Sequence, residues 1–245
     1  MTYCVGLNLD EGMIFASDSR TNAGVDDVRR AGKMRVFAKD GERLLVTLSA
    51  GNLSLTQNAL NLLEYRASHG DGPGLYGASS MFEVATLVGD AMREIRKRDE
   101  PYLRDSGVDA SASFIVGGQI AGERQRLFLV YSEGNFIESN PETCWFQSGE
   151  AKFGKPILDR VITPQTSLAE ATKCALVSFD STMRSNVSVG PPIEVLVYQR
   201  DSLSAGNRHK LDADDPYLKT VRTYWNDSLR AALTHLPAPD WLPGG

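Results

Sequence analysis

Residues 1–18 read Met1-Thr2-Tyr3-Cys4-Val5-Gly6-Leu7-Asn8-Leu9-Asp10-Glu11-Gly12-Met13-Ile14-Phe15-Ala16-Ser17-Asp18. Apolar side chains alternate over residues 3–9 and again over residues 12–18, on either side of a turn-forming Asp10-Glu11-Gly12. This pattern is typical of a β-hairpin. In such a hairpin Thr2 begins the first strand and Asp18 ends the second, so we expect their side chains to lie close together.

A second hairpin is predicted over residues 35–38 and 43–48, which flank Asp40-Gly41. The chain is therefore expected to begin as antiparallel sheet. Apolar side chains then recur at helical spacing in two successive segments, at Leu53, Leu60, Leu63 and Ala67 and at Met81, Val84, Ala85, Val88, Met92 and Ile95. Two adjacent helices should follow the first strands.

A further apolar surface is expected on the first of these helices. Leu55, Ala59 and Leu62 lie beside the stripe assigned to the core, where a monomer would expose them. We expect this surface to contact another copy of the chain. Head-to-tail packing of that kind closes into a ring or continues as a helix.

The second half of the chain repeats the order of strands and then helices. Ser167 with Glu170 three residues later is a capping box and predicts the start of a helix. Strands are predicted over residues 111–117, 127–131, 144–147 and 193–198, and a terminal helix over residues 216–235. This order fits an α+β fold with two packed sheets and a helical layer on each side. We expect one domain over residues 2–236 and an irregular tail over residues 237–245.

Composition restricts the classes of function. The 245 residues, 42% of them hydrophobic, suit one sizeable domain, and the net charge of −5 gives no basic footprint for nucleic acid. No apolar run reaches the roughly 18 to 20 residues of a membrane span, and the first residues do not show a basic region followed by an apolar run, so no signal peptide is expected. The three cysteines lack metal-ligand spacing and predict a reduced, cytoplasmic setting. Neither a metal nor another cofactor is expected.

Thr2 is the candidate nucleophile. Methionine is removed when the next side chain is small, so Thr2 is expected to become the first residue of the mature chain. It would then carry a hydroxyl nucleophile and a free α-amine base on one residue. An α-amine has a reference pKa near ~8, so part of it is neutral near pH 7 and can accept the hydroxyl proton. No histidine is required.

An ordered set of motifs extends from Thr2 to about Arg200. It comprises Thr2 with the strand-like residues 3–7, the segments at residues 17–24 and 49–52, Lys33, and Ser185-Asn186-Val187-Ser188-Val189-Gly190-Pro191-Pro192. The set resembles proteasome-type β-subunits of the N-terminal nucleophile hydrolases, and among them the bacterial Anbu group of ancestral β-subunits. This resemblance implies a four-layer αββα sandwich of two antiparallel sheets.

The resemblance also implies roles for the charged residues. Asp18 would orient Lys33, whose positive charge favours the neutral α-amine and the alkoxide of Thr2. Lys33 is one residue closer to Thr2 than is usual in the family, which a deletion in the preceding loop explains; alternatively, Met34 occupies the lysine position. Arg20 is a weaker candidate, since a structural ion pair is as consistent with its sequence context.

The remaining site residues follow from the same resemblance. Backbone N–H groups at Ser49 or Ala50 would stabilise the oxyanion. Ser148 and Ser188 would match serines that surround the nucleophile. Ser185 stands where the family has an aspartate, which weakens the expected polar support around the α-amine.

The sequence thus predicts a threonine-type peptidase that forms a homo-oligomeric ring or helix and acts on a peptide or protein, with an unfoldase as a further candidate partner. Two alternatives remain. One is an inactive assembly or binding protein on the same fold, and the other is an N-terminal nucleophile amidohydrolase for small molecules. No nucleic acid or membrane partner is expected.

Overall fold

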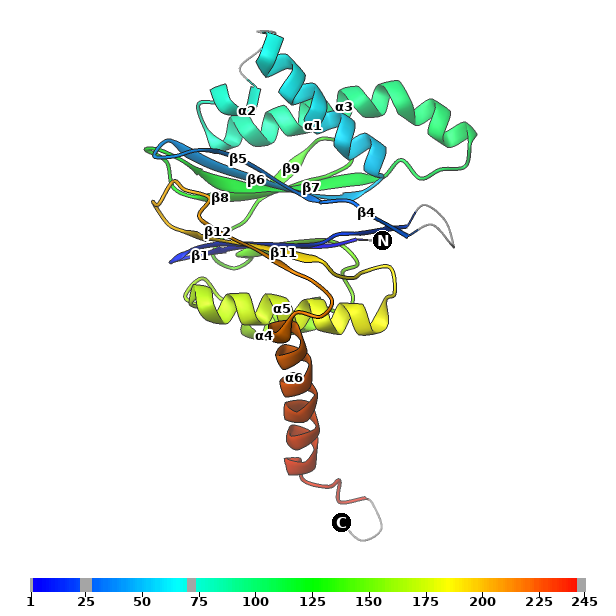
Figure 1. Cartoon of the computed structure of the whole chain (residues 1–245), viewed down its shortest axis with the longest axis vertical. Coiled ribbons are helices and arrows are strands. Elements are labelled where there is room, and N and C mark those ends of the chain that lie inside the picture. The colour runs from blue at the N-terminus through cyan, green and yellow to red at the C-terminus, as the bar shows by residue number, and fades with distance from the viewer. Residues whose placement is uncertain (1, 23–27, 70–73, 242–245) are drawn as a thin grey trace.

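Two five-stranded antiparallel sheets lie face to face, and helices cover their outer surfaces (Figure 1). The computed structural model of the chain describes residues 2–22, 28–69 and 74–241. Helices α1 and α3 cover one sheet, and α4 and α5 cover the other. This confirms the predicted α+β fold with a four-layer αββα sandwich.

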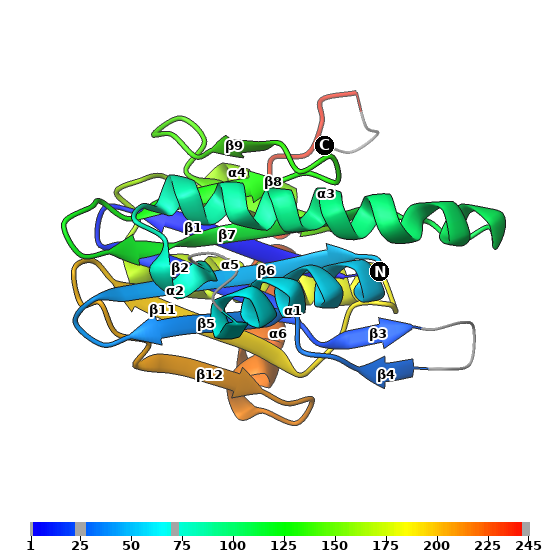
Figure 2. The ribbon, with the colours of Figure 1, turned by 90° about the horizontal axis from the view of Figure 1, so that it is seen from above.

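The first sheet has the strand order β5-β6-β7-β8-β9. Its strands are β5 (Met34–Lys39), β6 (Arg43–Gly51), β7 (Ala112–Ile120), β8 (Arg126–Val130) and β9 (Phe136–Glu138). The helices packed on it are α1 (Leu53–His69) and α3 (Met81–Asp105), with the short α2 (Gly74–Gly77) between them. Seen from above, α1 and α3 lie over this sheet and run roughly along its strands (Figure 2).

The second sheet has the order β10-β1-β2-β11-β12 and carries the amino terminus. Its strands are β1 (Tyr3–Leu9), β2 (Gly12–Asp18), β10 (Trp145–Gly149), β11 (Ile193–Gln199) and β12 (Asn207–Leu211). Helices α4 (Lys155–Val161) and α5 (Leu168–Ser185) pack on it. The two-stranded ribbon of β3 (Arg20–Asn22) and β4 (Val28–Arg30) extends from β2 beside the site (Figure 2).

Three apolar cores hold the layers together. Phe15, Leu48 and Ile115 belong to the core between the two sheets, and the other two cores lie between each sheet and its helices. Strands β1 and β2 are therefore buried on both faces, because sheet covers one face and helix the other. Each large side chain buried in this way contributes roughly 1.5–3 kcal/mol, so the strands that carry the site form a rigid base.

The predicted helix start at Ser167 is confirmed as the N-cap of α5, and the Glu170 carboxylate contacts the Ser167 hydroxyl rather than its backbone N–H. The Ser167 hydroxyl accepts a hydrogen bond from the Glu170 N–H at 3.3 Å, and Ser167 Oγ lies 3.0 Å from the Glu170 carboxylate. Helix α3 begins in a similar way, with the Ser80 side chain accepting the Glu83 N–H at 3.1 Å. These contacts satisfy N–H groups that a helix leaves free in its first turn.

The expected interface on α1 is wrong. Leu55 and Ala59 are buried in the core under the helices, and Leu62 is partly buried against it. Helix α1 contacts both its sheet and α3, so its apolar stripe is wider than that of a helix that packs on one surface. These side chains do not provide an exposed surface for another copy.

Helix α6 (Pro216–His235) projects away from the sandwich beyond α5 (Figure 1). Leu218 and Val221 are its buried residues, and both join the core next to α5. Residues 237–241 form no helix or strand. Over the described ranges, the search for helices long and apolar enough to cross a membrane finds none.

Candidate active site

The backbone of Thr2 is held on both sides at the start of β1. Its carbonyl accepts the N–H of Glu150 at 2.7 Å, and the N–H of the next residue, Tyr3, donates to the Asp18 carboxylate at 3.1 Å. Gly149 fits tightly beside it, since an added Cβ would meet the Thr2 carbonyl oxygen at 1.9 Å and Gly149 has φ of +90°. Thr2 is 8% exposed. Main-chain contacts thus fix the position of this largely buried residue.

Four donors converge on the carboxylate of Asp18, which is fully buried at the end of β2. One oxygen accepts Lys33 Nζ at 2.5 Å and the Tyr3 N–H. The other oxygen accepts the N–H groups of Arg20 at 3.2 Å and Gly190 at 3.3 Å. The β1–β2 pairing that the sequence predicted therefore brings Asp18 to the amino-terminal residues.

Lys33 occupies the cation position at this site, and Met34 does not. The Lys33 ammonium donates to Asp18 and, at 2.7 Å, to the carbonyl of Arg20, and its side chain is 4% exposed. Met34 begins β5 and packs in the core between the sheets.

Burial dominates the electrostatics of this group. Burial raises the pKa of the Asp18 carboxyl, and the Lys33 charge and the hydrogen bonds to the carboxylate oppose that rise. Burial likewise raises the pKa of the Cys4 thiol, which is fully buried and donates to the Ser49 carbonyl at 3.5 Å. Cys4 is thus a neutral packing residue between the sheets rather than a second nucleophile.

The geometry of β6 favours Gly51 as the oxyanion donor over the predicted Ser49 and Ala50. The Ser49 N–H is already bonded to the Lys33 carbonyl at 2.9 Å, so it is not free to bind an oxyanion. N–H groups along a strand alternate between its two neighbours, so the Ala50 N–H faces β7, where Ala50 pairs with Ser113. By the same alternation, the Gly51 N–H points to the same side of β6 as the Ser49 N–H, past the residue at which β5 begins. Gly51 is therefore the geometric candidate.

Ser148 lies on β10, opposite Cys4 of β1. Its hydroxyl is 2.6 Å from the hydroxyl of Ser113 on β7, so the pair joins the two sheets next to the site. Ser113 was not predicted from the sequence. This hydrogen bond connects β7 to β10, which ends at Gly149 beside Thr2.

The loop after α5 closes the opposite side of the site. Arg20 donates to the Val187 carbonyl at 2.6 Å and lies over Gly190, where an added Cβ would be 2.6 Å from its guanidinium carbon. The Ser188 N–H bonds to the Asn186 side chain at 2.9 Å. Ser185 is the exposed last residue of α5, directly before Asn186.

Glu150 and Asn186 were missed by sequence reasoning. Asn186 Nδ2 donates to the Glu150 carboxylate at 2.8 Å, and both residues are buried. Their contact links the α5 loop to the residue whose N–H holds Thr2. The sequence carries no signal for this pair, because the two residues meet only when the end of β10 and the loop after α5 come together.

A pocket of about 310 Å³ opens next to these residues. Its lining includes Ala50, Gly51 and Gly149 at the end nearest Thr2. At its other end Ser111, Ser132 and Glu133 also line a second pocket of about 280 Å³. The two pockets share this part of their lining, and we refer to them together as the groove.

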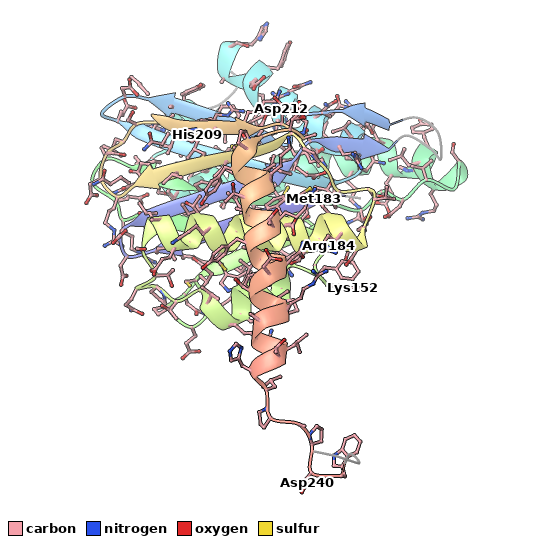
Figure 3. All side chains as sticks on the ribbon, turned by 60° about the horizontal axis from the view of Figure 1, so that its bottom comes forward. Lys152, Met183, Arg184, His209, Asp212 and Asp240 are labelled. Carbon is pink, nitrogen blue, oxygen red and sulfur yellow. The ribbon has the colours of Figure 1, made fainter. Side chains whose placement is uncertain are left out.

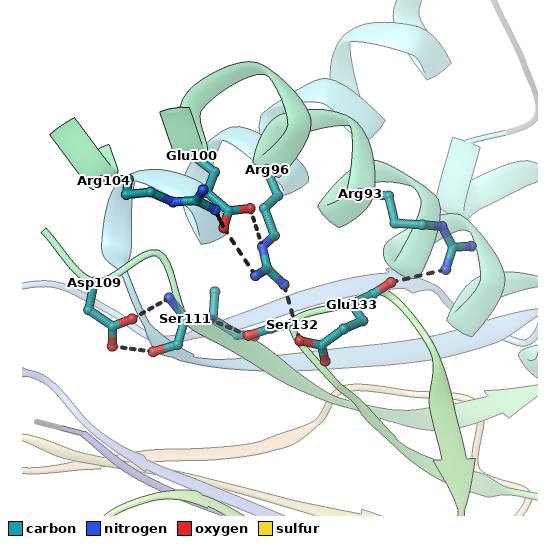
Figure 4. A network of polar contacts seen from close by, with 9 residues as sticks. Arg93, Arg96, Glu100, Arg104, Asp109, Ser111, Ser132 and Glu133 are labelled. Carbon is teal, nitrogen blue, oxygen red and sulfur yellow. Dashed lines mark hydrogen bonds and ion pairs between the residues drawn. The ribbon is translucent and has the colours of Figure 1, made fainter. Parts of the chain in front are cut away.

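The far half of the groove is bordered by charged side chains from the end of α3 (Figure 4). Arg96 bridges Glu100 at 2.8 Å and Glu133 at 3.2 Å, and Arg104 contacts Glu100 at 2.9 Å. Within the described parts of the chain, no group of three or more His, Cys, Asp or Glu side chains has an arrangement that could hold a metal ion.

Solved structures of the same architecture match the chain over almost its full length. Anbu, the ancestral β-subunit, from Yersinia bercovieri is 44% identical, with a TM-score of 0.91 over 97% of this chain and 99% of that one. The chain belongs to the Anbu family of proteasome-type β-subunits.

Two further structures agree with this assignment. The Gly-1 mutant of Anbu from Hyphomicrobium sp. strain MC1 is 44% identical, covers 98% of this chain and all of its own, and gives a TM-score of 0.92. The chain in the helical assembly of the Anbu complex from Pseudomonas aeruginosa is 46% identical, with a TM-score of 0.93 over 98% of each chain. No protein-family model matches the chain, and no curated protein matches it.

Proposed function

We propose that the chain is a threonine-type N-terminal nucleophile hydrolase that cleaves amide bonds through Thr2 after removal of Met1. The observation that carries this proposal is the buried pair of Lys33 and Asp18, 2.5 Å apart and bonded to the residue next to Thr2. A buried ion pair is expensive to desolvate, and its location beside a residue with a hydroxyl and an α-amine gives it a chemical purpose.

The reaction needs no group beyond the chain and water. The Thr2 hydroxyl oxygen attacks the amide carbonyl carbon while the neutral α-amine accepts the hydroxyl proton. Collapse of the tetrahedral intermediate breaks the C–N bond, and the α-ammonium returns that proton to the leaving amine. Water then attacks the Thr2 ester, with the α-amine again as base, and releases the acid.

Lys33 and Gly51 have electrostatic roles in this scheme. The Lys33 ammonium favours the neutral α-amine and the developing alkoxide, and Asp18 holds it in place. The Gly51 N–H donates to the oxyanion of the tetrahedral intermediate. Removal of one such donor costs on the order of 10² to 10³ in rate. Ser148 and Ser188 are proposed to orient the amino-terminal groups.

Intact mass and covalent labelling test the proposal together. The purified chain should lack the mass of Met1, and an epoxyketone, which requires both the hydroxyl and the α-amine, should add once per chain at Thr2. Thr2→Ala is the matched control and should remain unlabelled. Quantitative retention of Met1, or equal labelling of the control, would contradict the mechanism, because an acylated α-amine cannot act as base.

The groove favours an extended substrate over a small amide. It starts at Gly51 and Gly149 and continues past Glu133 to Arg96, which gives room for several residues of a peptide. A peptide library and simple amides, assayed side by side, separate the two substrate classes. Cleavage of simple amides at equal kcat/KM would favour the amidohydrolase alternative.

We further propose that the chain assembles with copies of itself. The Pseudomonas aeruginosa relative forms a helical assembly, and α6 carries an apolar face that its own chain leaves uncovered. Leu229, Leu233 and Leu236 are exposed, Leu233 by 68%. They continue the stripe that begins at Leu218 and Val221. Figure 3 shows α6 and the following segment to Asp240 extending from the body.

A further inference from the structure

A buried carboxylate next to Thr2 has no role in the mechanism above. Glu150 follows β10 and is 7% exposed. Its N–H donates to the Thr2 carbonyl at 2.7 Å, and its carboxylate accepts Asn186 Nδ2 at 2.8 Å and the Lys152 N–H at 3.2 Å. The same residue thus contacts the nucleophile through its backbone and carries a negative charge on its side chain.

We propose that Glu150, held by Asn186, is the positioning residue that fixes Thr2 through its backbone N–H and whose carboxylate charge raises the basicity of the α-amine. The inference rests on the proposed function, because it assigns the α-amine as the base. It also explains how the site works with Ser185 where the family has an aspartate. The charge comes from a different element, the end of β10, and reaches the site through a different residue.

The surrounding charges leave this role open for Glu150. Asp18 is engaged by Lys33 and by three N–H groups, and Arg20 lies on the Val187 carbonyl. Cys4 of β1 is buried and neutral. Glu194 of β11 pairs with Arg208 on β12. Glu150 contacts the Thr2 backbone through its own N–H, and its carboxylate accepts hydrogen bonds from the neutral Asn186 side chain and the Lys152 N–H rather than pairing with a cation.

The sign of the effect follows from Coulomb's law. A negative charge near the α-amine favours the ammonium form, and so strengthens the amine as an acceptor of the Thr2 hydroxyl proton. Lys33 acts in the opposite direction. The two charges together set the basicity of the amine, with Lys33 keeping it neutral near pH 7 and Glu150 stabilising the ammonium that forms during attack.

Titration of the amine tests this assignment without requiring activity. A fusion cleaved directly before Thr2 yields the full chain with a free α-amine, and a ¹³C-methyl label on threonine reports the amine's protonation through the Thr2 methyl shift. Glu150→Gln should lower the midpoint by about 1 pH unit, as expected for a unit charge ~10 Å away at an effective dielectric constant of ~20. The epoxyketone labelling rate of this variant should fall about tenfold, following the weaker base.

Three further variants make the result decisive. Glu150→Asp keeps the charge and should restore most of the midpoint, whereas Glu142→Gln, at an exposed carboxylate, should leave it unchanged. Asn186→Leu removes the donor that holds Glu150 and should lower the midpoint by a smaller amount, which provides a test if Glu150→Gln does not fold. An unchanged midpoint in Glu150→Gln, or an equal shift in Glu142→Gln, overturns the proposal. A shifted midpoint in a chain that takes up no epoxyketone supports the Glu150 assignment and refutes the hydrolase.

Discussion

Replacing Asp18 should lower the free energy of unfolding much more than replacing Lys33. In Asp18→Asn, an NH₂ group replaces one carboxylate oxygen, so the two donors bonded to that oxygen lose their acceptor, and the buried Lys33 ammonium loses its counter-charge. Breaking a buried ion pair from one side costs about 3–5 kcal/mol. In Lys33→Met, the Asp18 carboxylate keeps its three N–H donors, and the loss should be about 1 kcal/mol near pH 5.

The cost of Lys33→Met should depend on pH. A buried acid whose folded pKa is raised loses stability as pH rises from its unfolded value, near ~4, through its folded value. Burial raises the pKa of Asp18, and Lys33 is the main opposing influence, so its removal moves the folded pKa further up. The destabilisation relative to wild type should therefore grow as pH rises from the folded pKa of Asp18 in the wild type to its higher folded pKa in the variant, by about 1.4 kcal/mol for each unit of that further rise.

Thermal unfolding at fixed chain concentration measures both effects. At about 2–4 °C per kcal/mol for a chain of this size, Asp18→Asn should lower Tm by on the order of 10 °C and Lys33→Met by a few degrees near pH 5. The exposed pair Lys155 and Asp159, 2.9 Å apart, is the matched control, with changes below about 0.5 kcal/mol. Both active-site variants should lose on the order of 10² to 10⁴ in epoxyketone labelling rate. Equal Tm losses for Asp18→Asn and Lys33→Met near pH 5 would refute the reasoning.

Two other changes test the surroundings of the site and the assembly. Gly149→Ala places a Cβ 1.9 Å from the Thr2 carbonyl oxygen at a φ of +90°. The variant should reduce epoxyketone labelling at least tenfold, and the backbone strain should cost about 1–3 kcal/mol of stability. Normal labelling would show that Thr2 does not need this backbone position. The double change of Leu229→Asp and Leu233→Asp should reduce the mass of the assembly in light scattering without changing Tm of the dissociated chain, because these side chains are exposed. Thr234→Asp is its control, and an unaltered assembly in the double variant would move the interface off α6.

The hairpin that places Thr2 near Asp18 was predictable because strand pairing is local there. Residues 3–9 and 12–18 alternate around a short turn, and the pairing of β1 with β2 follows from that turn alone. The layer order was predictable from the succession of strands and helices, although the αββα arrangement itself came from the family resemblance. The capping box at Ser167 also marked its helix correctly.

Other parts of the fold carry no pattern that a sequence reveals. Strand β12 consists of Asn207-Arg208-His209-Lys210-Leu211 and is largely exposed, because it is an edge strand and needs no alternating apolar face. The phase of α1 was wrong because contact with α3 widens its buried face. The ribbon of β3 and β4 is too short for a periodicity to develop.

The details of the site depend on contacts between distant segments. The direction of the Gly51 N–H follows from the pairing of β6 with β5 and β7, which residues 49–51 do not encode by themselves. The sequence match directed attention to Ser185, whereas the turn at the end of α5 places Asn186 inside. Its partner Glu150 lies on a separate element, so the pair is visible only after folding.

The length of α6 determines how neighbouring copies are arranged in the proposed assembly, and related chains with a longer or shorter α6 should differ in that arrangement. Its 20 residues span about 30 Å, and its buried anchors, Leu218 and Val221, lie in the first two turns, with Arg222 bonded to Asp180 on α5 at 2.8 Å. Each residue inserted beyond these anchors would swing the outer apolar face by about 100° and move it by about 1.5 Å. In the proposed assembly, the length of α6 therefore sets the twist and pitch between neighbouring copies, while the sheets and the nucleophile stay unaltered.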